Sequence, residues 1–280
     1  MHRNLRIFLP LTAIVVALVG YAGYQYFIVV DSPDEVTTEA ALEQLSEDLA
    51  DDESDAVSAD PESDEVAAAD SAADDSATED SATDDTAADG SAAAGVTGTW
   101  VVDDDFGDFA FENASGSFAG FRVDKELFVG GTQVAVGRSG DVTGSITIAD
   151  GAVTAGEITV DTTTLQSDIS MRESAIADAI KASDFPTATF ALTEAATIDT
   201  AALEAGDTVA VDITGDLTVA GATNSVTVAA EATVAEAGLA LIVGSADLVW
   251  ADYDVETPSS TAGEVADEGT LEFQLIVRLG

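Results

Sequence analysis

The sequence predicts an all-β domain over residues 96–280, closed as an antiparallel barrel or sandwich, behind a transmembrane helix and a disordered acidic linker. Three observations lead to this prediction. The first 30 residues contain a long apolar run, residues 31–95 hold 23 acidic side chains and no Lys or Arg, and from Val96 onward apolar residues recur at every second position. Charge therefore divides the 280-residue chain into three segments, 1–30, 31–95 and 96–280, of different physical character.

The N-terminal apolar run covers residues 7–30, where Gln25 is the only strongly polar side chain. As a helix, this run would be about 36 Å long, which is enough to cross a bilayer with some tilt. Arg3 and Arg6 precede it, and cytoplasmic flanks of such spans are enriched in basic residues. We therefore expect a single-pass signal-anchor in the cell membrane, with an extracytoplasmic C-terminal domain. A cleaved signal peptide ending near residues 20–22 is the alternative, although the apolar run continues beyond that point.

The linker at residues 31–95 consists mostly of Ala, Asp, Glu, Ser and Thr and contains no aromatic residue. Such a composition cannot bury enough apolar surface to offset the entropy lost on ordering. Only Glu39–Leu49 shows Leu residues at helical spacing, and we expect at most a transient helix there. The segment is interpreted as a solvated spacer between membrane and domain, with a diffuse cation-binding tail as the alternative.

The domain that follows shows strand-like alternation in many short stretches separated by turn residues. Asp150-Gly151, for example, is a typical hairpin turn between two alternating runs. The predicted strands are Trp100–Val102, Phe109–Glu112, Phe121–Phe128, the two runs flanking Asp150-Gly151, and residues 209–219, 226–234, 239–249 and 271–277. About eight to ten strands at hairpin spacing favour a closed antiparallel barrel or a sandwich.

One segment of the domain is predicted to be helical. Ser170 and Glu173 have the spacing of a capping box, and Ile176 and Ile180 follow at a separation of four residues. Pro186 prevents continuation of the helix. The sequence therefore predicts one helix of about ten residues, between a strand that ends near Leu165 and a strand that begins near Thr187. It either closes an end of the barrel as a lid or plug, or simply covers the core.

Composition excludes several classes of chemistry. The chain has no Cys, its single His is His2, and its formal net charge is −46. Disulfides, thiol catalysis and a Cys-type zinc site are therefore excluded, as is an imidazole base within the domain. Nucleic acid is not an expected partner, because phosphate binding needs clustered Lys and Arg.

Catalytic and metal-binding motifs are not recognisable either. A nucleophile elbow and a phosphate-binding loop are missing from the sequence, and acid pairs occur by chance in a domain with 31 Asp and Glu. The run Asp103–Asp108 differs from a calcium loop, because its Gly comes one position early and Ala114 occupies the closing position. We predict that the protein is not an enzyme and needs no metal or cofactor.

The predicted inward-facing positions are unusually small, as at Gly144, Gly215 and Ala230. A barrel of about eight strands is just wide enough to be filled by side chains or to hold one small ligand. Each methylene group transferred from water gains about 0.8 kcal/mol, so a long apolar guest could bind without charged contacts. The alternative is a closed interior in a chain that is rich in Ala and Gly.

Five stretches in order resemble the YceI-like family, from about residue 98 to the C-terminus. They are Trp100-x-Val102-Asp103, Ser117–Phe121, Thr164-Leu165 with Met171–Glu173, Asp184–Phe190, and Gly215-Asp216-Leu217-Thr218-Val219-x-Gly221-x-Thr223-x-x-Val226. The resemblance implies an eight-stranded lipocalin-like barrel of the bacterial envelope. It also implies a polyisoprenoid or another long-chain amphiphile as ligand, since several members carry one. Many members have His residues in the neighbourhoods that here contain Asp105–Phe106, Ala175 and Ala220, so a head-group or metal role of those His residues is not expected.

Strand parity selects the residues expected to line the barrel: Phe111, Phe121, Ile146, Ile158, Phe190, Leu217, Val228 and Phe273. Arg172 occupies the family's Arg position. It is either a head-group or lid contact or an ordinary ion pair with Glu173 in the first turn of the helix.

Two functions follow as hypotheses. The first is a membrane-anchored binding protein that holds a polyisoprenoid or acyl chain inside the barrel. The second is a cell-surface interaction or stress-protection module whose barrel is only a scaffold and whose acidic surface meets cations or basic partners. Partner binding by an acidic surface should depend strongly on salt, whereas binding of an uncharged chain should not.

Overall fold

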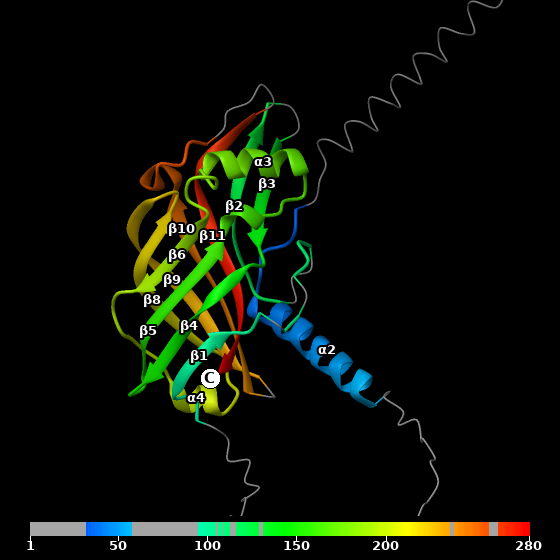
Figure 1. The fold of residues 1–280 in the computed structure, drawn as a ribbon, viewed down its shortest axis with the longest axis vertical. Helices are drawn as coiled ribbons and strands as arrows, with labels where there is room; N and C mark the ends of the chain where they lie inside the picture. Colours follow the sequence, from blue (N-terminus) through cyan, green and yellow to red (C-terminus); the bar gives the residue numbers. More distant parts are fainter. Residues whose placement is uncertain are drawn as a thin grey trace, which may run out of the picture.

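The computed structural model describes residues 32–57, 95–104, 106–107, 109–112, 116–128, 131–235, 238–257 and 263–280 (Figure 1). The predicted membrane helix at 7–30 lies outside these residues, as does the linker at 58–94. Within the part of the chain that is described, no helix is both long and apolar enough to cross a membrane.

The core of the molecule is an antiparallel barrel, as the alternating sequence predicts. Its strands close in the order β1, β4, β5, β6, β8, β9, β10 and β11, and β11 pairs again with β1. Their bounds are β1 Gly98–Val102, β4 Val142–Ala149, β5 Ala152–Asp161, β6 Thr187–Leu192, β8 Val209–Val219, β9 Ala222–Val234, β10 Leu239–Val249 and β11 Gly263–Leu279. Two-residue turns, such as Asp150-Gly151 with positive φ at both positions, join neighbouring strands.

Two further strands extend the sheet beyond the closed barrel. Strands β2 (Phe118–Leu127) and β3 (Gly131–Ser139) form a hairpin, and β2 pairs with the first part of β11. Strand β1 pairs with the last part of β11, so β1 and β2 follow one another along the same edge of that long strand. A two-residue strand, β7 (Ala196–Thr197), pairs with β5.

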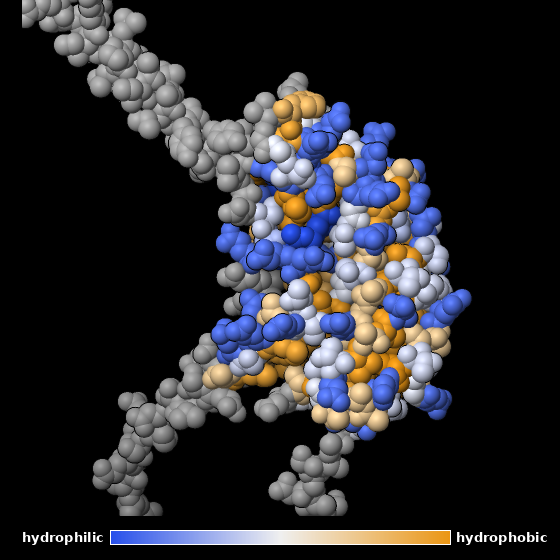
Figure 2. Space-filling view, turned by 180° about the vertical axis from the view of Figure 1, so that it is seen from behind, coloured by the Kyte–Doolittle hydropathy of each residue, from blue (hydrophilic) through white to orange (hydrophobic). Residues whose placement is uncertain are grey.

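Short helices lie at both ends of the barrel. Helix α4 (Thr200–Glu204) lies at one end, and α3 (Ser170–Ala179) lies across the other end beside the β2–β3 hairpin (Figure 1). Two 3-10 turns, η1 (Thr162–Thr164) and η3 (Trp250–Tyr253), follow β5 and β10. On the outer surface, hydrophilic side chains are spread among hydrophobic ones (Figure 2).

Helix α3 forms where it was predicted, but its start differs from a capping box. The N-cap is Ile169, which has no capping side chain. Glu173 does reach back, and its carboxylate accepts a hydrogen bond of 3.1 Å from the backbone N–H of Ser167. The Glu173 side chain therefore stabilises the segment that precedes the helix, and it does not bond to the N-cap residue as it would in a capping box.

The predicted strand at residues 109–112 is wrong, and strand β3 was not predicted. Residues 109–110 have no regular structure and 111–112 form bends, since β1 and β2 together occupy the edge of β11 to which such a strand would pair. Phe109 is held instead by its ring, which lies 6.3 Å from that of Phe118. In β3, Gly137 and Arg138 interrupt the apolar alternation that identifies the other strands.

The first part of the predicted disordered linker is an ordered helix, which is a correction to the sequence analysis. Helix α2 (Thr38–Val57) begins where the Thr37 hydroxyl accepts a hydrogen bond from the Ala40 N–H. Its buried residues Ala41 and Leu45 pack against outward-facing side chains of β10 and β11, which are Leu239, Leu241, Val243 and Ile276. An isolated helix of this kind is marginal in water, so its stability comes from this docking.

Leu45→Glu should release α2 from the barrel. Burial of a Leu side chain is worth about 1.5–3 kcal/mol, so we expect amide hydrogen exchange in α2 to accelerate by roughly 10- to 100-fold. Hydrogen-exchange mass spectrometry would measure this, with Glu43→Ala on the exposed side of the same helix as control. Equal exchange rates in both variants would contradict the docking.

Candidate functional site

The barrel encloses an apolar cavity of about 170 Å³. Every strand of the closed barrel contributes to its wall, and none of the lining residues is charged. Thr189 is the only lining residue with a polar side chain apart from the indole of Trp100. The cavity can therefore offer dispersion and exclusion of water to a guest, but hardly any hydrogen bonding.

Six of the eight residues predicted to line the barrel do line the cavity: Ile146, Ile158, Phe190, Leu217, Val228 and Phe273. Strand parity was therefore correct in β4, β5, β6, β8, β9 and β11. Whether these side chains contact a ligand remains a prediction.

Phe111 and Phe121 do not line the cavity. Phe111 lies in the bent segment before β2, where its backbone carbonyl accepts a hydrogen bond from Arg138. Phe121 lies in β2 beyond the closed barrel, and its ring packs edge-on against Trp250 with centroids 5.7 Å apart. Parity predicts only which face of a strand a side chain lies on. It does not predict that residue 111 lies outside a strand, or that β2 lies beyond the point where the barrel closes.

Two glycines in the wall of the barrel make space for aromatic side chains and do not enlarge the cavity. A Cβ atom at Gly215 would lie 2.4 Å from Phe190 Cζ on the neighbouring strand. At Gly244, a Cβ atom would lie 2.5 Å from Phe273 Cζ, directly across from it in β11. The absence of a side chain at these two positions therefore lets two phenylalanine rings approach the backbone of the wall closely, so these glycines do not add open volume.

The α4 end of the cavity is closed. Ile198 and Leu203 are buried there beside Val96 and Trp100. The indole N–H of Trp100 donates a 2.9 Å hydrogen bond to the Val96 carbonyl, so the ring is buried with its polar atom satisfied. Asp199 caps α4 by accepting a hydrogen bond from the Ala202 N–H.

The other end of the cavity is bounded by a second apolar cluster. Leu217, Leu248 and Tyr253 are buried, and Phe190 and Leu271 pack against them. This cluster lies where η3 crosses the strand ends, on the side of the barrel that carries α3 (Figure 1).

The ionisation of the Tyr253 hydroxyl can be measured, and it tests whether this end of the barrel is buried. Burial, with a smaller effect of the neighbouring Asp252 carboxylate, raises the pKa of its hydroxyl above the usual value. The folded state therefore favours the neutral phenol, and its contribution to stability is lost as pH rises from the unfolded value, about 10, through the folded pKa. Because the other three tyrosines precede residue 32, phenolate absorbance of residues 32–280 should report Tyr253 alone and titrate above pH 10. Titration at the ordinary value would contradict its burial.

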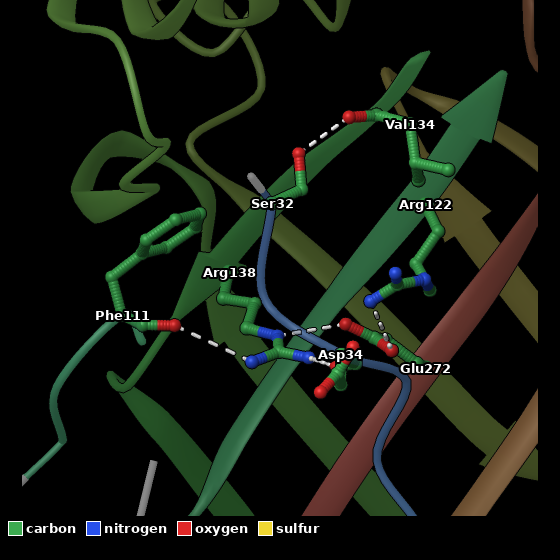
Figure 3. A network of polar contacts seen from close by, with 7 residues as sticks. All are labelled: Ser32, Asp34, Phe111, Arg122, Val134, Arg138 and Glu272. Carbon is green, nitrogen blue, oxygen red and sulfur yellow. Dashed lines mark hydrogen bonds and ion pairs between the residues drawn. The ribbon is translucent and has the colours of Figure 1, made fainter. Parts of the chain in front are cut away.

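A buried ion-pair network lies on the outer face of the β11–β2–β3 sheet (Figure 3). Arg138 Nε is 2.7 Å from Glu272 Oε1, and Arg122 Nη1 is 3.6 Å from Glu272 Oε2. The Arg138 guanidinium also donates to the backbone carbonyls of Phe111 and Asp34, at 3.3 and 2.9 Å. Arg138 therefore fastens two otherwise irregular segments to the sheet.

The YceI-like domain family matches residues 112–277, which is more than half of the chain. The chain belongs to the YceI-like family. The matched range does not include β1 or α2, although both pack on the barrel. No curated protein matches the chain.

Several solved structures are similar to this YceI-like protein. BcnA of Burkholderia cenocepacia has 21% sequence identity and a TM-score of 0.42, over 56% of this chain and 95% of its own. A polyisoprenoid binding domain from Saccharophagus degradans, implicated in plant cell wall breakdown, has 18% identity and a TM-score of 0.47, over 59% and 94%. The Campylobacter jejuni YCEI protein has 18% identity and a TM-score of 0.41, over 51% and 84%.

Two of the stretches that resemble the YceI-like family meet at the η3 end of the barrel. Phe190 of the first lies over Gly215 of the second, and a Cβ atom at Gly221 would lie 2.5 Å from Phe185 Cε1. Gly221 has a φ of +82° in the β8–β9 turn, a conformation that favours glycine. The first stretch therefore supplies the aromatic rings, and the second supplies the glycines against which they pack.

Arg172 of the YceI-like domain lies away from the cavity. It pairs with Asp168, which precedes α3, and not with Glu173. The position is thus that of a structural ion pair at the start of the helix, and a head-group contact stays a prediction. Among the described residues, no group of three or more His, Cys, Asp or Glu could hold a metal ion.

Proposed function

We propose that the protein is a membrane-anchored, extracytoplasmic binding protein that holds a long, uncharged apolar ligand inside the barrel. The observation that carries the proposal is the cavity, whose wall presents no charged side chain to a guest. Each methylene buried there contributes about 0.8 kcal/mol, roughly a fourfold gain in affinity. A polyisoprenoid or acyl chain fits this chemistry, and the family resemblance implies the same class of ligand.

The size of the cavity limits what binds without rearrangement. Its volume of about 170 Å³ is close to that of an engineered apolar cavity of about 150 Å³ that accepts benzene. A longer chain therefore needs additional room. Phe190 and Phe273 are only partly buried, so rotation of their rings away from Gly215 and Gly244 would provide it.

Anchoring and location rest on the sequence. The apolar run at residues 7–30 behind Arg3 and Arg6 supports a single membrane span with the barrel outside the cytoplasm.

Native mass spectrometry of the full chain from cell envelope, followed by organic extraction, tests the proposal. We expect a discrete additional mass that solvent releases, and uptake that is nearly independent of salt when polyprenol or fatty acid is offered. An apo mass with no uptake of either lipid would contradict ligand binding. It would favour the alternative of a surface module with a scaffold barrel.

A further inference from the structure

The segment that would connect the membrane to the barrel is held on the barrel from its first described residue. We refer to residues 32–37 as the strap. The Ser32 hydroxyl donates a hydrogen bond to the Val134 carbonyl of β3, and Arg138 donates one to the Asp34 carbonyl (Figure 3). Thr38, the first residue of α2, bonds to Glu231 of β9. The strap therefore crosses the outer face of the sheet from β3 toward β9 and passes directly into the docked helix.

The length of chain before the strap places this part of the barrel close to the bilayer. The predicted span ends at Val30, so only Asp31 separates it from Ser32. Two Cα–Cα steps reach at most about 8 Å. The headgroup layer outside the hydrocarbon core is about 5–8 Å thick. Ser32 and its partner Val134 would consequently lie at the headgroup layer.

The β2–β3 hairpin end of the barrel is the end that this short connection brings to the membrane. Val134 lies three residues from Gly131, at about 10 Å from the start of β3. Phe128, at the hairpin tip, is 65% exposed. The closed α4 end lies at the other end of β11, whose 17 residues span about 55 Å.

We propose that the barrel rests on the outer face of the bilayer by its β2–β3 and α3 end, with Phe128 in the headgroup layer. In this orientation the end of the cavity that Leu217, Leu248 and Tyr253 bound faces the membrane. An apolar ligand that displaces this cluster then passes between bilayer and barrel with little exposure to water. The inference rests on the anchor and the ligand of the proposed function.

Charge does not hold this end at the membrane, because Arg122 and Arg138 pair with Glu272 and Arg172 pairs with Asp168. Five of the six Lys and Arg residues of the barrel domain lie in β2, β3, α3 or the turn after α3, and these are Arg122, Lys125, Arg138, Arg172 and Lys181. Asp124 and Glu126 lie on the same hairpin, so attraction to anionic lipid is not what holds it. The covalent connection to the membrane span keeps the hairpin at a high effective concentration near the bilayer.

Single-cysteine labelling tests the orientation, since the chain has no Cys. Full-length Phe128→Cys and Ala201→Cys, an exposed position on α4, would carry an environment-sensitive dye in nanodiscs that contain spin-labelled lipid. We expect at least about fivefold quenching at position 128 and none at 201, because a tilt of about 40° leaves the two ends about 40 Å apart. Equal quenching at both positions, quenching at 201 alone, or none at either would overturn the proposal.

A lengthened connection separates orientation from ligand binding. Twenty Gly and Ser residues inserted between Asp31 and Ser32 would span about 25 Å. We expect quenching at position 128 to fall at least threefold and ligand uptake from the nanodisc to slow, while ligand occupancy at equilibrium stays unchanged. Unchanged quenching would overturn the orientation. An empty barrel in both chains, with quenching as expected, would leave the orientation standing and contradict only the proposed ligand.

Discussion

Arg138→Ala is expected to lower the free energy of unfolding by about 3–5 kcal/mol, the cost of leaving a buried charge without its partner. Arg138 is 3% exposed and Glu272 is fully buried. Without Arg138, the nearest guanidinium to Glu272 is that of Arg122, at 3.6 Å and without a hydrogen bond. The Asp34 carbonyl also loses its donor, which should loosen the strap. Urea unfolding of residues 32–280 measures the loss.

Arg278→Ala is the matched control for this experiment. Arg278 pairs with Asp103 at 2.8 Å, but its side chain is 53% exposed. Exposed pairs contribute about 0–1 kcal/mol, so little change is expected. Arg138→Met combined with Glu272→Gln should recover much of the stability, since it removes the uncompensated carboxylate. A loss for Arg138→Ala no larger than that for Arg278→Ala would contradict the importance of the network.

This network shows what strand alternation cannot predict. Glu272 alternates with inward-facing residues of β11, which ordinarily indicates an exposed position. Its burial depends on the strap and on the segment before β2, and its partner Arg138 is 134 residues away. Periodicity describes one strand at a time, and so it carries no information about what covers the outer face.

The docking of α2 did leave a signal in the sequence. Residues 239–243 are apolar without interruption, whereas a strand with one solvated face should alternate. That run indicates a strand covered on both faces, and the Leu residues of Glu39–Leu49 are the complementary apolar stripe. Because the sequence analysis relied on composition there, it assigned the helix to the same disordered linker as the acidic residues that follow it.

The sequence predicted the residues of the barrel interior best, because the face on which a side chain lies depends only on its position within its own strand. Alternation in β4, β8 and β11 places Ile146, Leu217 and Phe273 on the inner face regardless of partners. Phe121 obeys the same alternation but lies outside the cavity, since β1 occupies the place beside β11 where the barrel closes. The point at which the barrel closes is determined by pairing between strands that are distant in sequence, and no local sequence pattern predicts this pairing.

Leu217→Glu is expected to abolish uptake of polyprenol or fatty acid, with a loss of at least about 100-fold in affinity. Leu217 lines the cavity, where a carboxylate must either keep its water or be protonated at a cost of several kcal/mol. Both outcomes put water or a polar group where an apolar chain would lie. Val249→Glu, at an exposed position on β10, introduces the same charge outside the barrel and should leave uptake unchanged.

Leu217→Ala distinguishes loss of binding from loss of folding. It should destabilise the barrel by about 2–5 kcal/mol, because the enlarged cavity loses packing contacts. Its wall stays apolar and gains volume, so uptake should be retained or increased where the fold persists. Circular dichroism would verify the fold of all three variants, and native mass spectrometry would count bound lipid. A barrel that serves only as a scaffold predicts that none of the variants binds lipid and that the charge inside the cavity makes no difference.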